Sequence, residues 1–221
     1  MTGTVRTGGP RPLRADARQN RDRILAAARD VFVELGPAAP LEEISRRAGT
    51  GIATLYRRFP DRQALMRAVV LDALAGSADA ARRAAADEAD PFAALAAYMH
   101  GVLDIRTAAV IPALLEAIPL DDWEVRAVRE ESSRLVQALV DNAHRAGTLR
   151  ADVTFGDIGM LVVRLSRPLP GRVTRDLDNR LAHRHLDLLI NGLRAIPDPA
   201  AVIGGPGLTL ADLQALRPDH G

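Results

Sequence analysis

Residues 52–62 carry side chains suited to binding the phosphates and base edges of nucleic acid. Thr54 offers a hydroxyl group, Tyr56 a phenol, and Arg57 and Arg58 two adjacent guanidinium groups. A guanidinium group can bind a phosphate, or the O6 and N7 atoms of guanine, through two parallel hydrogen bonds. Because such side chains are poorly suited to a protein core, the stretch predicts a DNA-contacting surface.

Two short helices joined by a glycine turn are predicted to position these side chains. Apolar residues at three- and four-residue steps indicate the first helix over residues 41–48, and Gly49 fits the left-handed position that ends a helix. The second helix is predicted over residues 52–59, with Leu55 and Phe59 turned inward. Helix, turn, helix is a plan in which the second helix enters the DNA major groove by its N-terminal end.

This plan divides the polar residues into two groups. The N-terminal residues of the second helix, and one residue a turn later, lie nearest the base edges, whereas the others face phosphates. For Tyr56, a half-buried place in the core is the alternative. The residues predicted to read bases are Ile52, Ala53, Thr54 and Arg57, and those predicted to bind phosphates are Tyr56, Arg58 and Arg62.

The elements around this motif suggest four segments. Residues 1–19 are rich in Gly, Pro and Arg, and predict a flexible basic arm whose Arg6, Arg11, Arg14 and Arg18 either reach DNA or lie in a solvated tail. A helical pattern begins at Asn20 and stops at Gly36-Pro37. The predicted segments are the arm at 1–19, a helix-turn-helix DNA-binding domain at 20–66, a ligand-binding and dimerisation domain at 67–196, and a Pro/Gly-rich tail at 197–221.

The chain beyond residue 60 also has helical periodicity and no alternation typical of strands, so we expect an all-α protein of about nine helices. Capping residues mark the expected starts at Asp61, Asp90, Asp121 and Thr174. A short helix is expected over residues 111–118, with Pro112 in its first turn, and an apolar helix over residues 154–167.

Composition supports a helical protein with one basic region. Of 221 residues, 48% are hydrophobic and 3% aromatic, none is cysteine, and all 29 basic residues are arginine. Residues 1–62 hold 12 Arg against 7 Asp and Glu, a net charge of +5, and the remaining residues hold 17 Arg against 21 Asp and Glu, a net charge of −4. This uneven distribution favours a surface that binds a polyanion over a random drift in composition. No apolar run is long enough for a membrane span or a signal peptide, so we expect a cytoplasmic protein without a membrane partner.

Residues 24–66 resemble the DNA-binding domain of the TetR/AcrR family of bacterial transcription regulators. The resemblance rests on Ile24-Leu25-x-Ala27-Ala28, on Ala48-Gly49, and on Thr54-Leu55-Tyr56-Arg57-Arg58-Phe59. It implies a homodimer, a helical C-terminal domain that senses a small-molecule effector, and usually repression that the effector releases. The family often has Thr, Ser and His where this chain has Leu41, Gly51 and Arg58. The C-terminal half, through Trp123 and residues 145–153, resembles a subgroup common in high-GC actinobacteria.

Two further sites are predicted in the C-terminal half. The first is a mainly apolar effector pocket, for which plain core packing is the alternative reading of each residue. The second is a dimer interface, because the last helix carries two apolar stripes and so predicts two neighbours. The expected pocket residues are Tyr98, Met99, Arg106, Trp123 and Met160, and the expected interface residues are Ile158, Val162, Leu186, Leu189 and Leu193.

Motifs for catalysis or metal binding are absent from the sequence. His183 and His185 stand two apart on one helix, and His100 and His144 have no ligand spacing beside them. We therefore expect no metal, no cofactor and no enzymatic activity. A ligand-responsive dimeric repressor is the favoured function. The alternatives are activation instead of repression, an architectural DNA-binding protein of the same fold without a ligand, and an all-α enzyme acting on a small molecule.

Overall fold

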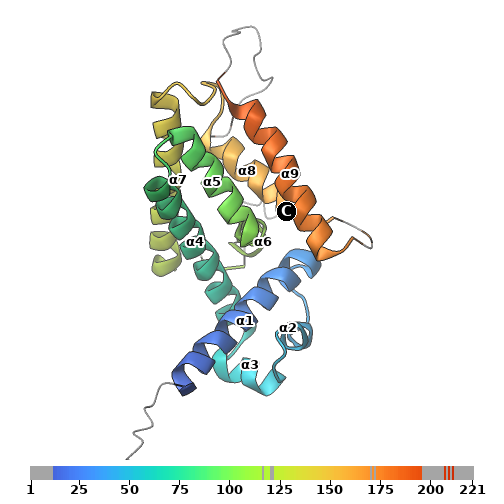
Figure 1. The fold of residues 1–221 in the computed structure, drawn as a ribbon. Helices are drawn as coiled ribbons and strands as arrows, with labels where there is room; N and C mark the ends of the chain where they lie inside the picture. Colours follow the sequence, from blue (N-terminus) through green and yellow to red (C-terminus); the bar gives the residue numbers. More distant parts are fainter. Residues whose placement is uncertain are drawn as a thin grey trace, which may run out of the picture.

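Nine α-helices make up the part of the chain that the computed structural model describes, which is residues 12–115, 117–119, 122–169, 171, 173–195, 207, 209 and 211 (Figure 1). They are α1 (Pro12–Leu35), α2 (Leu41–Arg47), α3 (Ile52–Arg58), α4 (Arg62–Asp87), α5 (Pro91–Asp104), α6 (Thr107–Leu115), α7 (Trp123–Arg145), α8 (Phe155–Leu165) and α9 (Arg175–Leu193). An isolated bridge between Leu149 and Arg194 is the only β pairing among these residues. The predicted all-α class is confirmed.

Two hydrophobic cores share two long helices, α4 and α7. The first core joins α1, α2, α3 and the N-terminal half of α4, and side chains of α6 and α7 such as Val110, Leu114 and Val125 complete it. The second core joins the C-terminal half of α4 to α5, α7, α8 and α9. Figure 1 shows α1–α3 at one end of the molecule and α5–α9 at the other, with α4 running from one to the other. A movement of α4 or α7 therefore reaches both cores.

Side-chain caps explain where most helices begin. Asp61 accepts a hydrogen bond from the Ala64 backbone N–H at 2.7 Å, and Asp90 accepts one from that of Phe92 at 3.2 Å. Thr154 and Asp157 form a reciprocal capping box at the start of α8. Thr174 caps α9 as the sequence predicts.

Three helix boundaries differ from the sequence prediction. Helix α1 begins at Pro12, so Asn20 lies inside it, because the residues between them are mostly good helix formers that extend the helix. Described residues 12–19 are thus helical rather than part of a flexible arm, and residues 1–11 lie outside the described part. The cap of α7 is Asp122, which accepts from the Val125 N–H at 3.1 Å, rather than Asp121.

The third difference concerns the short helix α6. It begins at Thr107, four residues before the expected start, and therefore has Pro112 in its interior. The prediction had placed the proline in the first turn, where its missing N–H costs nothing. The sequence from Thr107 to Val110 continues the helix backwards, so Pro112 instead removes one hydrogen-bond donor from the helix.

Candidate nucleic-acid interface

A tight turn fixes the direction of α3 relative to α2. Gly49 has a φ of +64°, and its N–H donates to the Arg46 carbonyl at 3.2 Å, while the Thr50 N–H donates to the Ser45 carbonyl at 3.0 Å. These two bonds satisfy carbonyl groups that the end of α2 leaves open. Gly51 is extended and its carbonyl accepts from the Thr54 N–H at 2.9 Å, which starts α3.

Four of the seven predicted contact residues are exposed on the outer face of α3. Leu55 is fully buried and Phe59 nearly so, and these two side chains hold the helix on the first core. Tyr56 is 47% exposed, which excludes the alternative of a half-buried core tyrosine. Ala53, Arg57 and Arg58 are also exposed, whereas Ile52 and Thr54 are half-buried.

The arginines of α3 differ from those of α2 in what they bind. Arg46 and Arg47 both donate to Glu43, at 2.7–2.8 Å, and Arg47 also pairs with Glu34 at 2.6 Å. Hydrogen bonds from Arg46 and Arg47 lower the pKa of Glu43 to about 2, so this carboxylate stays charged. Among the described residues, by contrast, no acid or carbonyl group binds Arg57 or Arg58. The guanidinium groups of α3 are therefore available to an external anion.

Arg62 has a structural role that the sequence did not reveal. Its Nη1 atom donates to the carbonyl oxygens of Pro37 and Ala39, at 3.0 and 2.5 Å. These bonds tie the first turn of α4 to the loop between α1 and α2. Because the Nη1 atom already donates to two carbonyl oxygens, the first role of Arg62 is to stabilise the helix-turn-helix fold, and phosphate binding is secondary.

The predicted pocket residues do not gather around one cavity. Met99 is fully buried in the second core, and the Tyr98 hydroxyl is buried and shares a hydrogen bond with Ser77 Oγ at 3.1 Å. Trp123 is 75% exposed at the start of α7, so the prediction of a pocket tryptophan is wrong. Trp123 is the first residue of α7, directly after its cap Asp122. Met160 is half-buried on α8.

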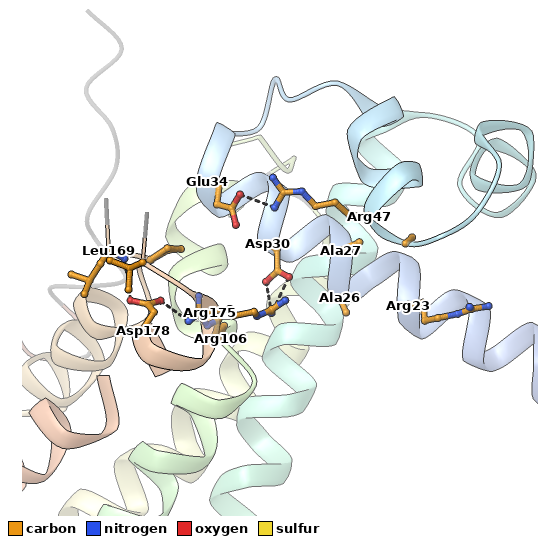
Figure 2. Close-up of a pocket in the computed structure, with 13 residues that line it drawn as sticks. Arg23, Ala26, Ala27, Asp30, Glu34, Arg47, Arg106, Leu169, Arg175 and Asp178 are labelled. Atoms are coloured by element: carbon orange, nitrogen blue, oxygen red, sulfur yellow. Dashed lines mark hydrogen bonds and ion pairs between the residues drawn. The ribbon is translucent and has the colours of Figure 1, made fainter. Parts of the chain in front are cut away.

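A cleft of about 570 Å³ lies where α1 meets the segment before α9, and of the five predicted pocket residues only Arg106 lines it (Figure 2). Arg175 Nη2 lies 2.9 Å from Asp30 Oδ2, and Arg106 Nη2 lies 2.6 Å from Asp178 Oδ2. Next to the cleft, Arg29 donates to the Ile105 carbonyl at 3.1 Å. The Arg175–Asp30 and Arg29–Ile105 bonds connect α1 to the C-terminal part of the chain, and the Arg106–Asp178 bond connects the turn between α5 and α6 to α9. We call this region the domain junction.

The predicted dimer residues lie mostly inside the protomer. The buried ones pack in the second core and therefore present no surface to another copy, whereas Leu189 is half-buried. The other apolar stripe of α9 is the exposed one, with Leu188 62% and Leu177 40% exposed. Sequence periodicity revealed both stripes but not which one the protomer's own core uses. The buried residues are Ile158, Val162, Leu186 and Leu193.

No helix of the described part is long and apolar enough to cross a membrane. In the same residues, no group of three or more His, Asp or Glu side chains is placed to hold a metal ion.

An exposed, basic recognition helix in a helix-turn-helix frame, carried on a helical body, defines a DNA-binding regulator of transcription. Comparison with protein families agrees. Residues 24–69 match the model of bacterial regulatory proteins of the tetR family, and residues 90–195 match that of the C-terminal domain of SbtR-like transcriptional regulators. The chain belongs to the TetR family.

Solved structures give the same result. A TetR transcriptional regulator from Streptomyces coelicolor is 33% identical, and the match covers 79% of this chain and 98% of that one, with a TM-score of 0.54. A TetR regulatory protein from Mycobacterium vanbaalenii is also 33% identical over 83% and 99% of the two chains, with a TM-score of 0.56. The regulator LfrR from Mycobacterium smegmatis, solved with proflavine, shares the fold at 21% identity, 78% and 96% coverage and a TM-score of 0.54. Comparison with curated protein sequences gave no match.

Proposed function

We propose that this protein is a homodimeric repressor that binds a palindromic operator and is released from it by a small molecule. The observation that carries the DNA-binding part is the outer face of α3, where Tyr56, Arg57 and Arg58 are exposed and the two guanidinium groups have no partner among the described residues. In this proposal Ala53 and Arg57 contact base edges, and Tyr56 and Arg58 contact phosphates.

Dimerisation is proposed because one recognition helix reads only one half-site. Two copies related by a two-fold axis present two α3 helices to successive major grooves about 34–36 Å apart. The exposed stripe of α9, with Leu177 and Leu188, offers an apolar surface suited to this contact.

Effector response is proposed to act through the domain junction. The cleft of about 570 Å³ is large enough for a small molecule, and it borders both α1 and the C-terminal helices. A molecule that enters it alters the contacts of Arg106 and Arg175 and so shifts α1 against α9. LfrR, a structural neighbour, is solved in complex with proflavine, which supports the proposal of a small-molecule effector. The effector weakens DNA binding only if it binds the DNA-incompetent state more tightly.

Selection of bound fragments from a random DNA pool tests the proposal. We expect a palindrome whose half-sites lie about one helical turn apart. The double variant Tyr56→Ala/Arg58→Ala, whose two side chains are exposed and leave the core intact, is expected to enrich nothing. Fragments without a shared motif would indicate an architectural role instead. A small molecule that binds the cleft without changing operator affinity would contradict the release mechanism.

A further inference from the structure

Helices α5 and α9 place two histidines edge to edge. His100 Nδ1 lies 2.8 Å from His183 Nδ1, and the two rings are nearly coplanar, with an interplanar angle of 6°. Their centroids are 5.1 Å apart, much farther than the two nitrogens, so the rings meet at their edges and not face to face. A separation of 2.8 Å is that of a hydrogen bond, in which one Nδ1 atom donates and the other accepts.

The second nitrogen of each ring binds a carboxylate of the opposite helix. His100 Nε2 lies 3.1 Å from Asp187 Oδ1, and His183 Nε2 lies 2.8 Å from Asp104 Oδ1. Each helix carries a histidine followed by an aspartate four residues later, and residues four apart lie on the same face of a helix. The two helices therefore join these four side chains in one continuous chain of hydrogen bonds.

These hydrogen bonds determine how many protons the two rings hold. An ionised carboxylate only accepts hydrogen bonds, so each Nε2 atom carries a proton. The bond between the two Nδ1 atoms requires a further proton, which lies between the rings. Two neutral imidazoles carry one proton each, so this pair holds one proton more and bears one positive charge. The carboxylates of Asp104 and Asp187 lie beside that charge and attract it.

A change in this number of protons breaks the contact between the rings. Without the shared proton, two lone pairs face each other across 2.8 Å. With a second proton between the rings, two N–H groups point at each other across the same distance. Neither arrangement makes a hydrogen bond, so the rings must move apart. Histidine is the side chain whose ordinary titration falls between pH 5 and 8, so both changes are within reach of modest changes in pH.

Two charged side chains bond to the rings in the part of the chain that the structure describes, Asp104 of α5 and Asp187 of α9. Helix α6, which also packs against α5, has no ionisable residue. Other ionisable residues on the surrounding helices have partners of their own or are exposed. They include Tyr98 with Ser77, Arg82 with Asp79 and Glu131, His144 with the Arg150 carbonyl, Asp157 with Thr154, Arg180 with Asp176, and the exposed Arg164, Arg184 and His185. The two carboxylates and the solvent therefore control the shared proton.

We propose that this cluster is a pH-sensitive clamp, which holds α5 and α9 together by one shared proton and opens when that proton is lost or a second one binds. Both histidine side chains are 30% exposed, so protons exchange with the solvent.

The clamp lies next to the domain junction. Asp104 is the last residue of α5, and the next two residues make contacts of the junction. The Ile105 carbonyl accepts a hydrogen bond from Arg29 of α1, and Arg106 pairs with Asp178 of α9. Opening of the clamp therefore loosens α5 and α9 beside the contacts that connect α1 to the C-terminal part of the chain.

Urea unfolding of the full-length protein at several pH values between 5 and 8 tests the clamp. In the unfolded chain the two histidines bind two extra protons well below the ordinary histidine pKa of about 6.5, and none well above it. The folded pair holds one extra proton, so its contribution to stability rises with pH on the acid side and falls with pH on the alkaline side. We expect a maximum near pH 6.5, away from which the unfolding equilibrium constant changes by up to about tenfold per pH unit.

Three variants separate the clamp from other titrating groups. His183→Gln keeps a polar side chain but cannot share a proton, and it is expected to lose the maximum. Asp187→Asn removes one of the two negative charges, so the shared proton should leave at a lower pH and the alkaline side of the maximum should shift down in pH. His185→Gln is the matched control, because this exposed histidine lies on α9 two residues from His183 and outside the cluster. It should keep the maximum.

The ¹⁵N NMR signals of the ring nitrogens give a second measurement that does not depend on unfolding. Near pH 6.5 we expect both Nε2 atoms to be protonated and one proton to be shared between the Nδ1 atoms of His100 and His183. Two bare or two protonated Nδ1 atoms at this pH would overturn the proposal. So would a stability maximum that survives unchanged in both His100→Gln and His183→Gln.

Discussion

At the scale of single residues, neighbouring arginines are expected to serve different purposes. Arg58 is exposed and has no partner among the described residues, so Arg58→Ala should weaken binding to all DNA sequences and reduce the slope of log affinity against log salt by about one unit. Arg62→Ala instead removes bonds to the Pro37 and Ala39 carbonyls, and should lower the free energy of unfolding by on the order of 1–2 kcal/mol. Filter binding at several salt concentrations and urea unfolding separate the two effects. A reduced salt slope with unchanged stability in the Arg62 variant would restore its role as a phosphate ligand.

Tyr98 is expected to limit the stability of the folded protein at high pH. Burial raises its pKa to about 12, above the ordinary value of about 10, so the folded state holds this proton more tightly than the unfolded chain does. The resulting stability is complete below about pH 10 and is lost as the pH rises towards 12. The chain has no lysine or cysteine and its arginines stay charged, so few other groups titrate there. Urea unfolding at pH 9–11 should show this loss, and Tyr98→Phe should reduce it. An equally steep loss of stability in the Tyr98→Phe variant would show that another group causes it.

At the scale of elements, the turn between α2 and α3 depends on one glycine. A side chain at Gly49 meets no atom within 4 Å, but its φ of +64° is unfavourable for other residues. Gly49→Ala should therefore cost about 1–2 kcal/mol of stability from backbone strain alone. Gly51 has an ordinary φ of −74°, and Gly51→Ser adds a side-chain cap to α3 that should stabilise it by a few tenths of a kcal/mol. Thermal unfolding of both variants checks this, and equal destabilisation of the two would contradict it.

The sequence predicted most helices correctly because the features that start and orient a helix act within a few residues. The caps at Asp61, Asp90 and Thr174 act within one turn, and periodic apolar residues mark the buried face of α3. Contacts between distant segments were not predictable in this way. Only the fold shows that Trp123 is exposed and that His100 meets His183. The choice between the two apolar stripes of α9 likewise depends on which one the protomer's other helices already cover.

At the scale of the whole molecule, the two ends are joined by side chains rather than by a linker. Val110 and Leu114 of α6 pack in the core of the DNA-binding module, and α4 contributes to both cores. On the far side, the ion pair between Asp30 and Arg175 connects α1 to α9. Packing of α4 and α6 in the first core and this ion pair hold the DNA-binding helices against the C-terminal helices. In the proposed mechanism, a change at the cleft reaches α3 through these contacts.

The proposed dimer can be tested on the exposed stripe of α9. Leu188 is 62% exposed, so Leu188→Glu places a charge on that surface without disturbing the protomer core, whereas a charge at the buried Val162 would unfold it. We expect the variant to sediment as a monomer, and its affinity for a palindromic site to fall by about 10²-fold or more as the second half-site contact is lost. Leu35→Glu, at a leucine of α1 that is 55% exposed, is the control and should remain a dimer. A Leu188→Glu protein that still sedimented as a dimer would move the interface away from this stripe, and the spacing of the two α3 helices would then have to be set by another surface.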